Sequence, residues 1–188
     1  MSASLFQENS AADGGAILVD EGSLQLTNAL LVWNSSTVSG GGVRLQETAT
    51  YTGNFLTHGG ESAPTGASVA VMENSSATLG SSIIYGATTG AAVHVDTTAS
   101  LSIEYCNVYG NAEGNYENTT DPTGIYGNIS SDPSFGAYTA DGDPSNDTWQ
   151  LGAQSPCIDA GDPTQQDPDG TLANMGCFGG SGADWIIP

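Results

Sequence analysis

Short apolar pairs recur along the first half of the chain at an almost constant interval. The pairs are Ile17 and Val19, Val43 and Leu45, Val69 and Val71, and Val93 and Val95. Successive pairs begin 26, 26 and 24 residues apart. One residue separates the two members of each pair, so a strand points both apolar side chains to one face and the intervening side chain to the other. The pattern predicts one short strand in every repeat.

Each repeat contains two further apolar segments, separated by turns rich in Gly, Ser, Asn and Asp. They are Leu24–Leu26 and Leu30–Leu31, Thr50–Thr52 and Phe55–Leu56, Thr78–Leu79 and Ile83–Ile84, and Leu101–Ile103 and Val108–Tyr109. Three strands per repeat describe one coil of a β-solenoid, whose stacked coils bury a common apolar column. We therefore predict an all-β fold. A right-handed, single-stranded parallel β-helix of about four coils occupies residues 1–115, and an irregular C-terminal capping segment occupies residues 116–188.

The composition agrees with this fold and limits the partners. The chain contains 26 glycines, and only 12% of its residues are charged and 7% aromatic. Asp and Glu number 21 against one basic residue, Arg44, for a formal net charge of -20. Such a surface repels nucleic acids and anionic lipids. No signal peptide follows Met1 and no apolar run reaches the length of a membrane span, so we expect no membrane insertion by this chain.

Two segments resemble known families. The run FQENSAADGGAI at residues 6–17 resembles the FxxN…GGAI repeat of polymorphic outer-membrane proteins, which belong among the pectin-lyase-like parallel β-helices. The later repeats lose the Phe. Residues 132–180, with SPCIDAGDP at 155–163 and NMGCFGG at 174–180, resemble the tail of secreted bacterial β-helix proteins, with Asn174 where that pattern usually has Asp. The resemblance implies a prokaryotic extracellular or cell-surface protein whose tail ends the helix.

The resemblance implies a structural role for the C-terminal segment. We expect its apolar side chains to cover the last open coil, and they are Phe135, Trp149, Leu151, Ile158, Met175 and Phe178. A disulfide between Cys157 and Cys177 would stabilise this segment by roughly 3 kcal/mol. The alternative is that both are small buried thiols. We expect Cys106 to be a thiol in the core.

An oxygen-rich loop in the same segment is a candidate calcium site. Asp159, Asp162, Asp167 and Asp169 offer the hard oxygen ligands that Ca²⁺ accepts, although their spacing is not that of an EF-hand. The alternative, which we favour, is that these carboxylates accept hydrogen bonds from nearby backbone N–H groups in turns. Asp141, Asp143, Asn146 and Asp147 form a similar cluster with the same two interpretations.

A second candidate site lies on the outward side of the strands. Arg44, His94 and Asp96 alternate with the buried pairs and form a candidate ligand face. Two coils separate Arg44 from His94 by ~9.6 Å, too far for concerted acid–base catalysis.

The leading hypothesis is a non-catalytic structural or adhesive module that binds a glycan, a surface protein, or a second copy at its open first coil. The alternative is a polysaccharide lyase or hydrolase. Ice binding ranks third, because no Thr-x-Thr ladder runs through all coils.

Overall fold

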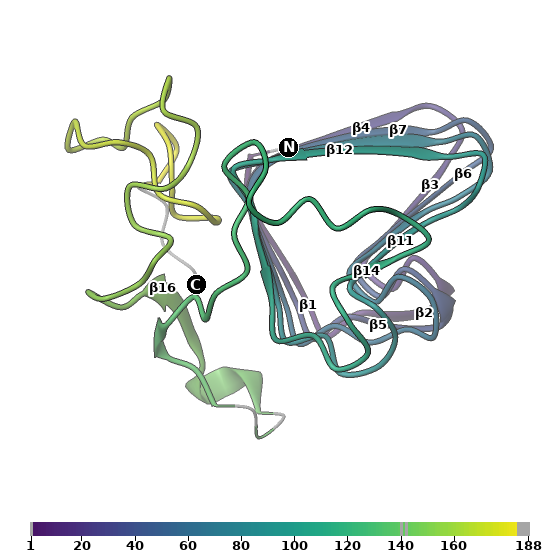
Figure 1. Cartoon of the computed structure of the whole chain (residues 1–188). Coiled ribbons are helices and arrows are strands. Elements are labelled where there is room, and N and C mark those ends of the chain that lie inside the picture. Colours follow the sequence, from purple (N-terminus) through teal and green to yellow (C-terminus); the bar gives the residue numbers. More distant parts are fainter. Residues whose placement is uncertain (1, 140, 142, 184–188) are drawn as a thin grey trace.

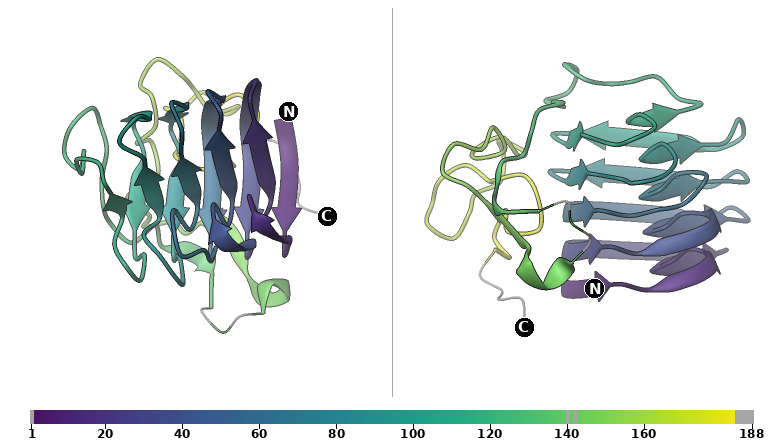
Figure 2. Two further views of the ribbon diagram at one scale, coloured as in Figure 1. Left: turned by 90° about the vertical axis from the view of Figure 1, so that its right-hand side faces the viewer. Right: turned by 90° about the horizontal axis from the view of Figure 1, so that it is seen from below.

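The computed structural model describes residues 2–139, 141 and 143–183. In this part of the chain the only helix is the 3-10 turn η1 (Pro144–Asn146), and all other regular structure is β-strand. Parallel strands stack into a β-solenoid of about four turns (Figures 1 and 2). The predicted all-β fold of stacked parallel coils is confirmed.

The first sheet turns a corner. Its strands are β1 (Ser2–Gln7), β4 (Ser23–Val32), β7 (Thr50–Gly59), β9 (Ser76–Gly80), β10 (Ile83–Tyr85), β12 (Ser100–Glu104) and β13 (Asn107–Tyr109). The long strands β4 and β7 bend at Asn28 and Phe55, and Ser81 and Tyr105 occupy the same corner between the shorter strands. All four residues have positive φ, between 51° and 53° for Asn28, Phe55 and Tyr105 and 46° for Ser81. The corner therefore divides the sheet into two faces with different surroundings.

The second sheet contains the apolar pairs found in the sequence. Its strands are β3 (Ile17–Asp20), β6 (Val43–Gln46), β8 (Val69–Val71), β11 (Val93–Val95) and β14 (Tyr116–Glu117). Ile17, Val43, Val69 and Val93 stack in one column, and Val19, Leu45, Val71 and Val95 in the next. The remaining pair of strands, β2 (Ser10–Asp13) and β5 (Ser35–Ser39), forms a short third sheet. The predicted register of the repeats is thus confirmed.

The first coil is less covered than the coils that follow it. Phe6, Ile17 and Val19 are half-buried, whereas Val43 and Leu45, the next members of the Ile17 and Val19 columns, are fully buried. At the opposite end, β14 pairs with β11, and residues 118–131 pass over the last coil. The Asn128 amide there donates to the carbonyl of Ile103 and accepts from the N–H of Cys106.

The rest of the C-terminal segment lies along the side of the solenoid and not over its end (Figure 1). Its hairpin, β15 (Phe135–Ala137) with β16 (Thr148–Leu151), places Trp149 against Gly59, where a Cβ would collide with the indole ring. The side-chain amide of Asn28 donates to the carbonyls of Cys177 and Gly179, at 3.1 and 2.7 Å.

The expectation that the apolar side chains of residues 132–180 cover the last coil is therefore corrected, since only residues 118–131 of the segment pass over it. Five of the six side chains proposed for that role, Phe135, Trp149, Leu151, Met175 and Phe178, pack in clusters on the side of the solenoid, and Ile158 is exposed. The physical reason is that Leu30 and Val32 point outward on that side, while Leu31 between them points into the core. A strand that is apolar on both faces needs a layer on each. We call this covered side, from residues 29–32 and 56–59 to β10, the lateral face.

Candidate functional site

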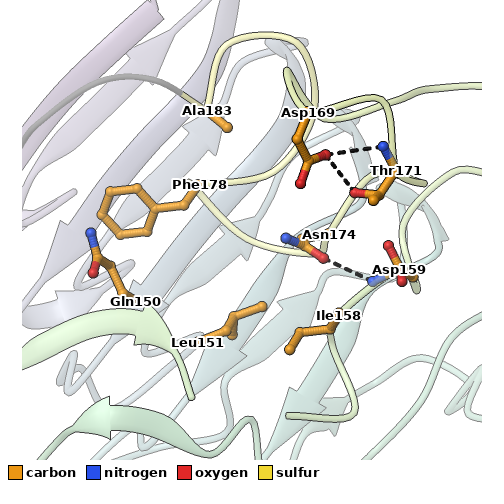
Figure 3. Close-up of a pocket in the computed structure, with 9 residues that line it drawn as sticks. All are labelled: Gln150, Leu151, Ile158, Asp159, Asp169, Thr171, Asn174, Phe178 and Ala183. Atoms are coloured by element: carbon orange, nitrogen blue, oxygen red, sulfur yellow. Dashed lines mark hydrogen bonds between the residues drawn. The ribbon is translucent and has the colours of Figure 1, made fainter. Parts of the chain in front are cut away.

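A cavity of about 470 Å³ lies within the C-terminal segment. We call it the C-terminal pocket (Figure 3). It is lined by Gln150, Leu151, Ile158, Asp159, Asp169, Thr171, Asn174, Phe178 and Ala183. The strand β16 contributes Gln150 and Leu151, and the other residues come from the loops that follow it. Most of these loop residues belong to the two sequence runs that resemble a family tail.

Apolar side chains line one part of the pocket. Leu151 and Phe178 pack against the clusters that attach the segment to the lateral face, so both are fixed by the solenoid. Ile158 is 38% exposed and contributes a third apolar surface. The backbone at Gly176 approaches Ile83 and Thr57 so closely that a Cβ would lie 2.9 Å from each side chain. This contact holds the loop that contains Asn174 and Phe178.

Polar groups surround that apolar surface. The Asn174 side-chain oxygen accepts a hydrogen bond from the N–H of Asp159 at 2.8 Å, and the Asn174 N–H donates to the carboxylate of Asp167 at 3.3 Å. Asn174 thereby joins the two loops across the pocket. Within the described residues the Asp159 carboxylate accepts no hydrogen bond, and its backbone has a φ of 54°. The free carboxylate, the Asn174 amide and the exposed Gln150 amide can all bond to a ligand.

The aspartates of this region have different electrostatic environments. Asp169 accepts hydrogen bonds from the N–H and the hydroxyl of Thr171, at 3.0 and 2.7 Å, and these bonds hold its pKa below the ordinary value. Asp167 is nearly buried, and this burial raises its pKa despite hydrogen bonds from the N–H groups of Gly180 and Asn174. Asp169 is therefore ionised at neutral pH. It can accept hydrogen bonds from a ligand but is a poor proton donor.

The structure does not bring the four candidate calcium ligands together. The described residues contain no group of three or more His, Cys, Asp or Glu side chains arranged to hold a metal ion. Asp162 accepts the N–H and hydroxyl of Thr164, just as Asp169 accepts those of Thr171. Asp162 and Asp169 therefore accept hydrogen bonds from backbone N–H groups two residues further on, as in turns, whereas Asp167 accepts from the more distant N–H groups of Asn174 and Gly180. Asp159 and Asp169 line the C-terminal pocket instead.

The three cysteines are buried thiols, and no disulfide joins them. Cys157 packs beside Ile83 and Met175, and it accepts a hydrogen bond from the Asn107 amide at 3.1 Å. Cys177 packs in a different cluster with Leu30, Val32 and Trp149. The predicted Cys157–Cys177 bridge is thus absent from the structure, because the two side chains enter separate apolar clusters. Burial raises the pKa of Cys106 and Cys177 to about 12.

The residues of the proposed ligand face make separate polar contacts. Arg44 binds the Asp13 carboxylate and the Ser39 hydroxyl, whereas His94 bonds through Nδ1 to Glu117 at 2.7 Å. Ala70 lies between Arg44 and His94 in the column. Asp96 accepts the N–H of Thr97 at 2.7 Å in the following turn. The three residues therefore do not form one site.

Two features of the structure were not predicted from the sequence. A shallow groove of about 310 Å³ crosses the outward side of β7, β9 and β12, bounded by Asp162 and Gln165. Inside the solenoid, His58 and Glu61 are both 0% exposed and bond at 2.9 Å. Glu61 fits because Gly42, in the preceding coil, has no side chain to occupy its place. Burial raises the pKa of Glu61, although the neighbouring His58 opposes this shift.

Comparisons with known proteins identify no relative of this chain. No family model matches the chain, and no match was found among the curated proteins or the solved structures. Among the described residues, no helix has the length and apolar character needed to cross a membrane. The function is therefore argued from the fold and the pocket.

Proposed function

We propose that this protein is a non-catalytic adhesive or structural module that binds a glycan in the C-terminal pocket. The observation that carries the proposal is the composition of the pocket, in which an apolar surface adjoins carboxylate and amide groups. A sugar ring presents C–H groups on its faces and hydroxyls around its edge. Phe178 and Ile158 suit the faces, and Asp159, Asp169 and Asn174 suit the hydroxyls.

The proposed setting is the surface or exterior of a prokaryotic cell. Support comes from the resemblance of residues 6–17 to polymorphic outer-membrane repeats and of residues 132–180 to the tail of secreted β-helix proteins. The net charge of -20 is in keeping with a surface that stays soluble and does not attract nucleic acids. A pectin-lyase-like relationship belongs to the same proposal.

A polysaccharide-active enzyme has less support. A glycoside hydrolase needs one carboxyl whose raised pKa keeps it protonated beside a second that is ionised. In the pocket, Asp169 has a lowered pKa, and the nearby carboxyl with a raised pKa, Asp167, does not line the pocket and accepts hydrogen bonds from the N–H groups of Gly180 and Asn174. The Arg44 and His94 side chains are engaged with carboxylates. Binding without turnover is the simpler use of this geometry.

A glycan array with the full chain tests the proposal, followed by calorimetric titration of the best ligand. Ile158→Trp fills the apolar part of the pocket, and we expect it to weaken binding by about tenfold or more, since overpacking displaces the ligand. Leu172→Trp is the matched control, because Leu172 is also exposed (45%) in this segment but does not line the pocket. Absence of any glycan ligand, or equal binding by both variants, would contradict the proposal.

A second copy of the chain is the second candidate partner. The half-buried Phe6, Ile17 and Val19 of the first coil form an apolar edge on which another coil could stack. Sedimentation tests this association. We expect Val19→Lys to abolish any assembly and Leu18→Lys, on the outward side of the same strand, to leave it intact. A monomer at all concentrations would rule it out.

A further inference from the structure

One outward face of the first sheet carries a regular array of hydroxyl groups. We call it the hydroxyl face, and it comprises residues 23–27 of β4, residues 50–54 of β7, β9 and β12. Two columns run across its strands in register. They are Ser23, Thr50, Ser76 and Ser100, and Gln25, Thr52, Thr78 and Ser102. Seven of these eight side chains bear a hydroxyl, three from Thr and four from Ser, and Gln25 is the exception at the start of the second column.

These hydroxyls are not used by the protein itself. Within the described residues, none of the seven donates or accepts a side-chain hydrogen bond, and six of the seven are exposed, with Ser76 half-buried. Hydroxyls in the turns behave differently. Thr123, Thr164 and Thr171 each donate to a nearby Asp carboxylate, at 2.6, 2.8 and 2.7 Å. These seven hydroxyls are therefore available to bond to a partner outside the chain.

The two columns are also uncharged in a strongly acidic protein. The two columns contain no Asp, Glu, Lys, Arg or His, although the chain has a net charge of -20. Glu104, in the neighbouring column, lies at the edge of the face. No aromatic side chain lies in either column, so the face lacks a platform on which sugar rings could stack. Neutrality and the absence of aromatic rings disfavour both a charged partner and a crystalline polysaccharide.

The array is periodic in two directions. Stacked strands repeat every ~4.8 Å, and alternate outward residues on one strand repeat every ~6.7 Å. Seen from the end of the solenoid, β4, β7 and β12 overlie one another along one nearly straight edge (Figure 1). A periodic array of neutral hydroxyls complements a partner with donors and acceptors at matching intervals, and three of these hydroxyls, on Thr52, Thr78 and Ser102, line the groove bounded by Asp162 and Gln165. Water oxygens in hexagonal ice repeat along one axis at nearly the strand spacing.

We propose that the hydroxyl face binds ice. The Thr methyl groups and hydroxyls of the two columns order a layer of water that matches the crystal, and the uncharged columns avoid the cost of excluding ions from it. The sequence contains no complete Thr-x-Thr ladder, but Ser hydroxyls occupy the same columns in register and make no internal hydrogen bond within the described residues. The inference does not depend on the glycan pocket.

Partition of the purified full chain into slowly growing ice tests this inference. We expect the protein to enter the ice and to inhibit recrystallisation. Thr52→Lys and Thr78→Lys, at the middle of the face, should lower the ice-bound fraction by about tenfold, because a buried ammonium is poorly tolerated. Thr52→Ser, which keeps the hydroxyl, should retain most binding. Leu18→Lys is the matched control, since Leu18 is exposed (45%) on the other sheet.

Three outcomes overturn the inference. They are exclusion of the wild-type chain from ice, partition unchanged by both lysine variants, and loss in Leu18→Lys equal to that in Thr52→Lys. Melting curves by circular dichroism establish that each variant is folded. Binding to crystalline cellulose or chitin that is lost in Thr52→Lys, without partition into ice, would assign the face to a polysaccharide instead. Ile158→Trp separates the two proposals, because it should impair glycan binding and leave ice partition unchanged.

Discussion

The two outward faces of the first sheet are built by the same long strands, but one face is exposed and the other is covered. Before the corner, β4 and β7 alternate buried apolar side chains with exposed polar ones, and the hydroxyl face stays open. After the corner, residues 29–32 and 56–59 are buried on both sides, and the C-terminal segment covers the lateral face. The difference shows that the local pattern of a strand decides whether its outer surface acquires a second layer.

The corner itself permits the change. Asn28 and Phe55 adopt positive φ there, which shifts the alternation of side chains so that successive residues become buried. Asn28 also fastens the covering segment through its two hydrogen bonds to Cys177 and Gly179. The position that turns the strand is thus the position that anchors the layer beside it.

Removing the Trp149 side chain, which anchors the C-terminal segment to the lateral face, should have the largest effect on stability. Trp149 is 4% exposed and packs against Gly59 and Phe135. Trp149→Ala should lower the free energy of unfolding by about 3–5 kcal/mol, as large aromatic truncations in cores do. Urea titration measures this change. A loss below about 1 kcal/mol would mean that the segment contributes little to stability.

A pH titration should show a moderate effect of the buried Glu61 on the stability of the fold. Burial raises the pKa of Glu61 above its ordinary value of 4.5, so the folded state favours the protonated carboxyl. The contribution of Glu61 to stability is therefore complete below that value and is lost as the pH rises through the folded pKa. In Glu61→Gln the fall in stability above pH 4.5 should be smaller than in the wild type. Parallel curves for the two proteins would contradict this assignment.

A substitution on the hydroxyl face should have the smallest effect on stability. Thr78→Ala removes an exposed hydroxyl that makes no internal hydrogen bond, so stability should change by less than about 0.5 kcal/mol. The comparison with Trp149→Ala under the same urea titration then measures how differently the two faces contribute. A large loss in Thr78→Ala would show that the hydroxyl face is structural.

The sequence predicts the solenoid well because its signal is periodic. The pairs led by Ile17, Val43, Val69 and Val93 recur at nearly equal intervals and stack in register, as expected. The turn role of Asp162 and Asp169 was also predictable, because each precedes a Thr by two residues and the interaction is local.

The docking of the C-terminal segment was not predictable in the same way, because it joins residues that are between 50 and 151 positions apart in the chain. The run Leu30-Leu31-Val32 carries the one signal, three consecutive apolar residues where a one-sided strand would alternate. The buried Glu61 depends on the space left by Gly42 in another coil. The pocket residues Gln150 and Phe178 likewise meet only after the segment folds back.

Reactivity of single cysteines on one strand tests the contrast of the two faces most directly. Thr52 and Thr57 both lie on β7, the first exposed on the hydroxyl face and the second buried beneath the C-terminal segment. The three native thiols are buried and give a low background. Thr52→Cys should react with a thiol reagent as fast as a free thiol, and Thr57→Cys should react only on unfolding. Equal, rapid labelling of both variants would show that the lateral face is not covered.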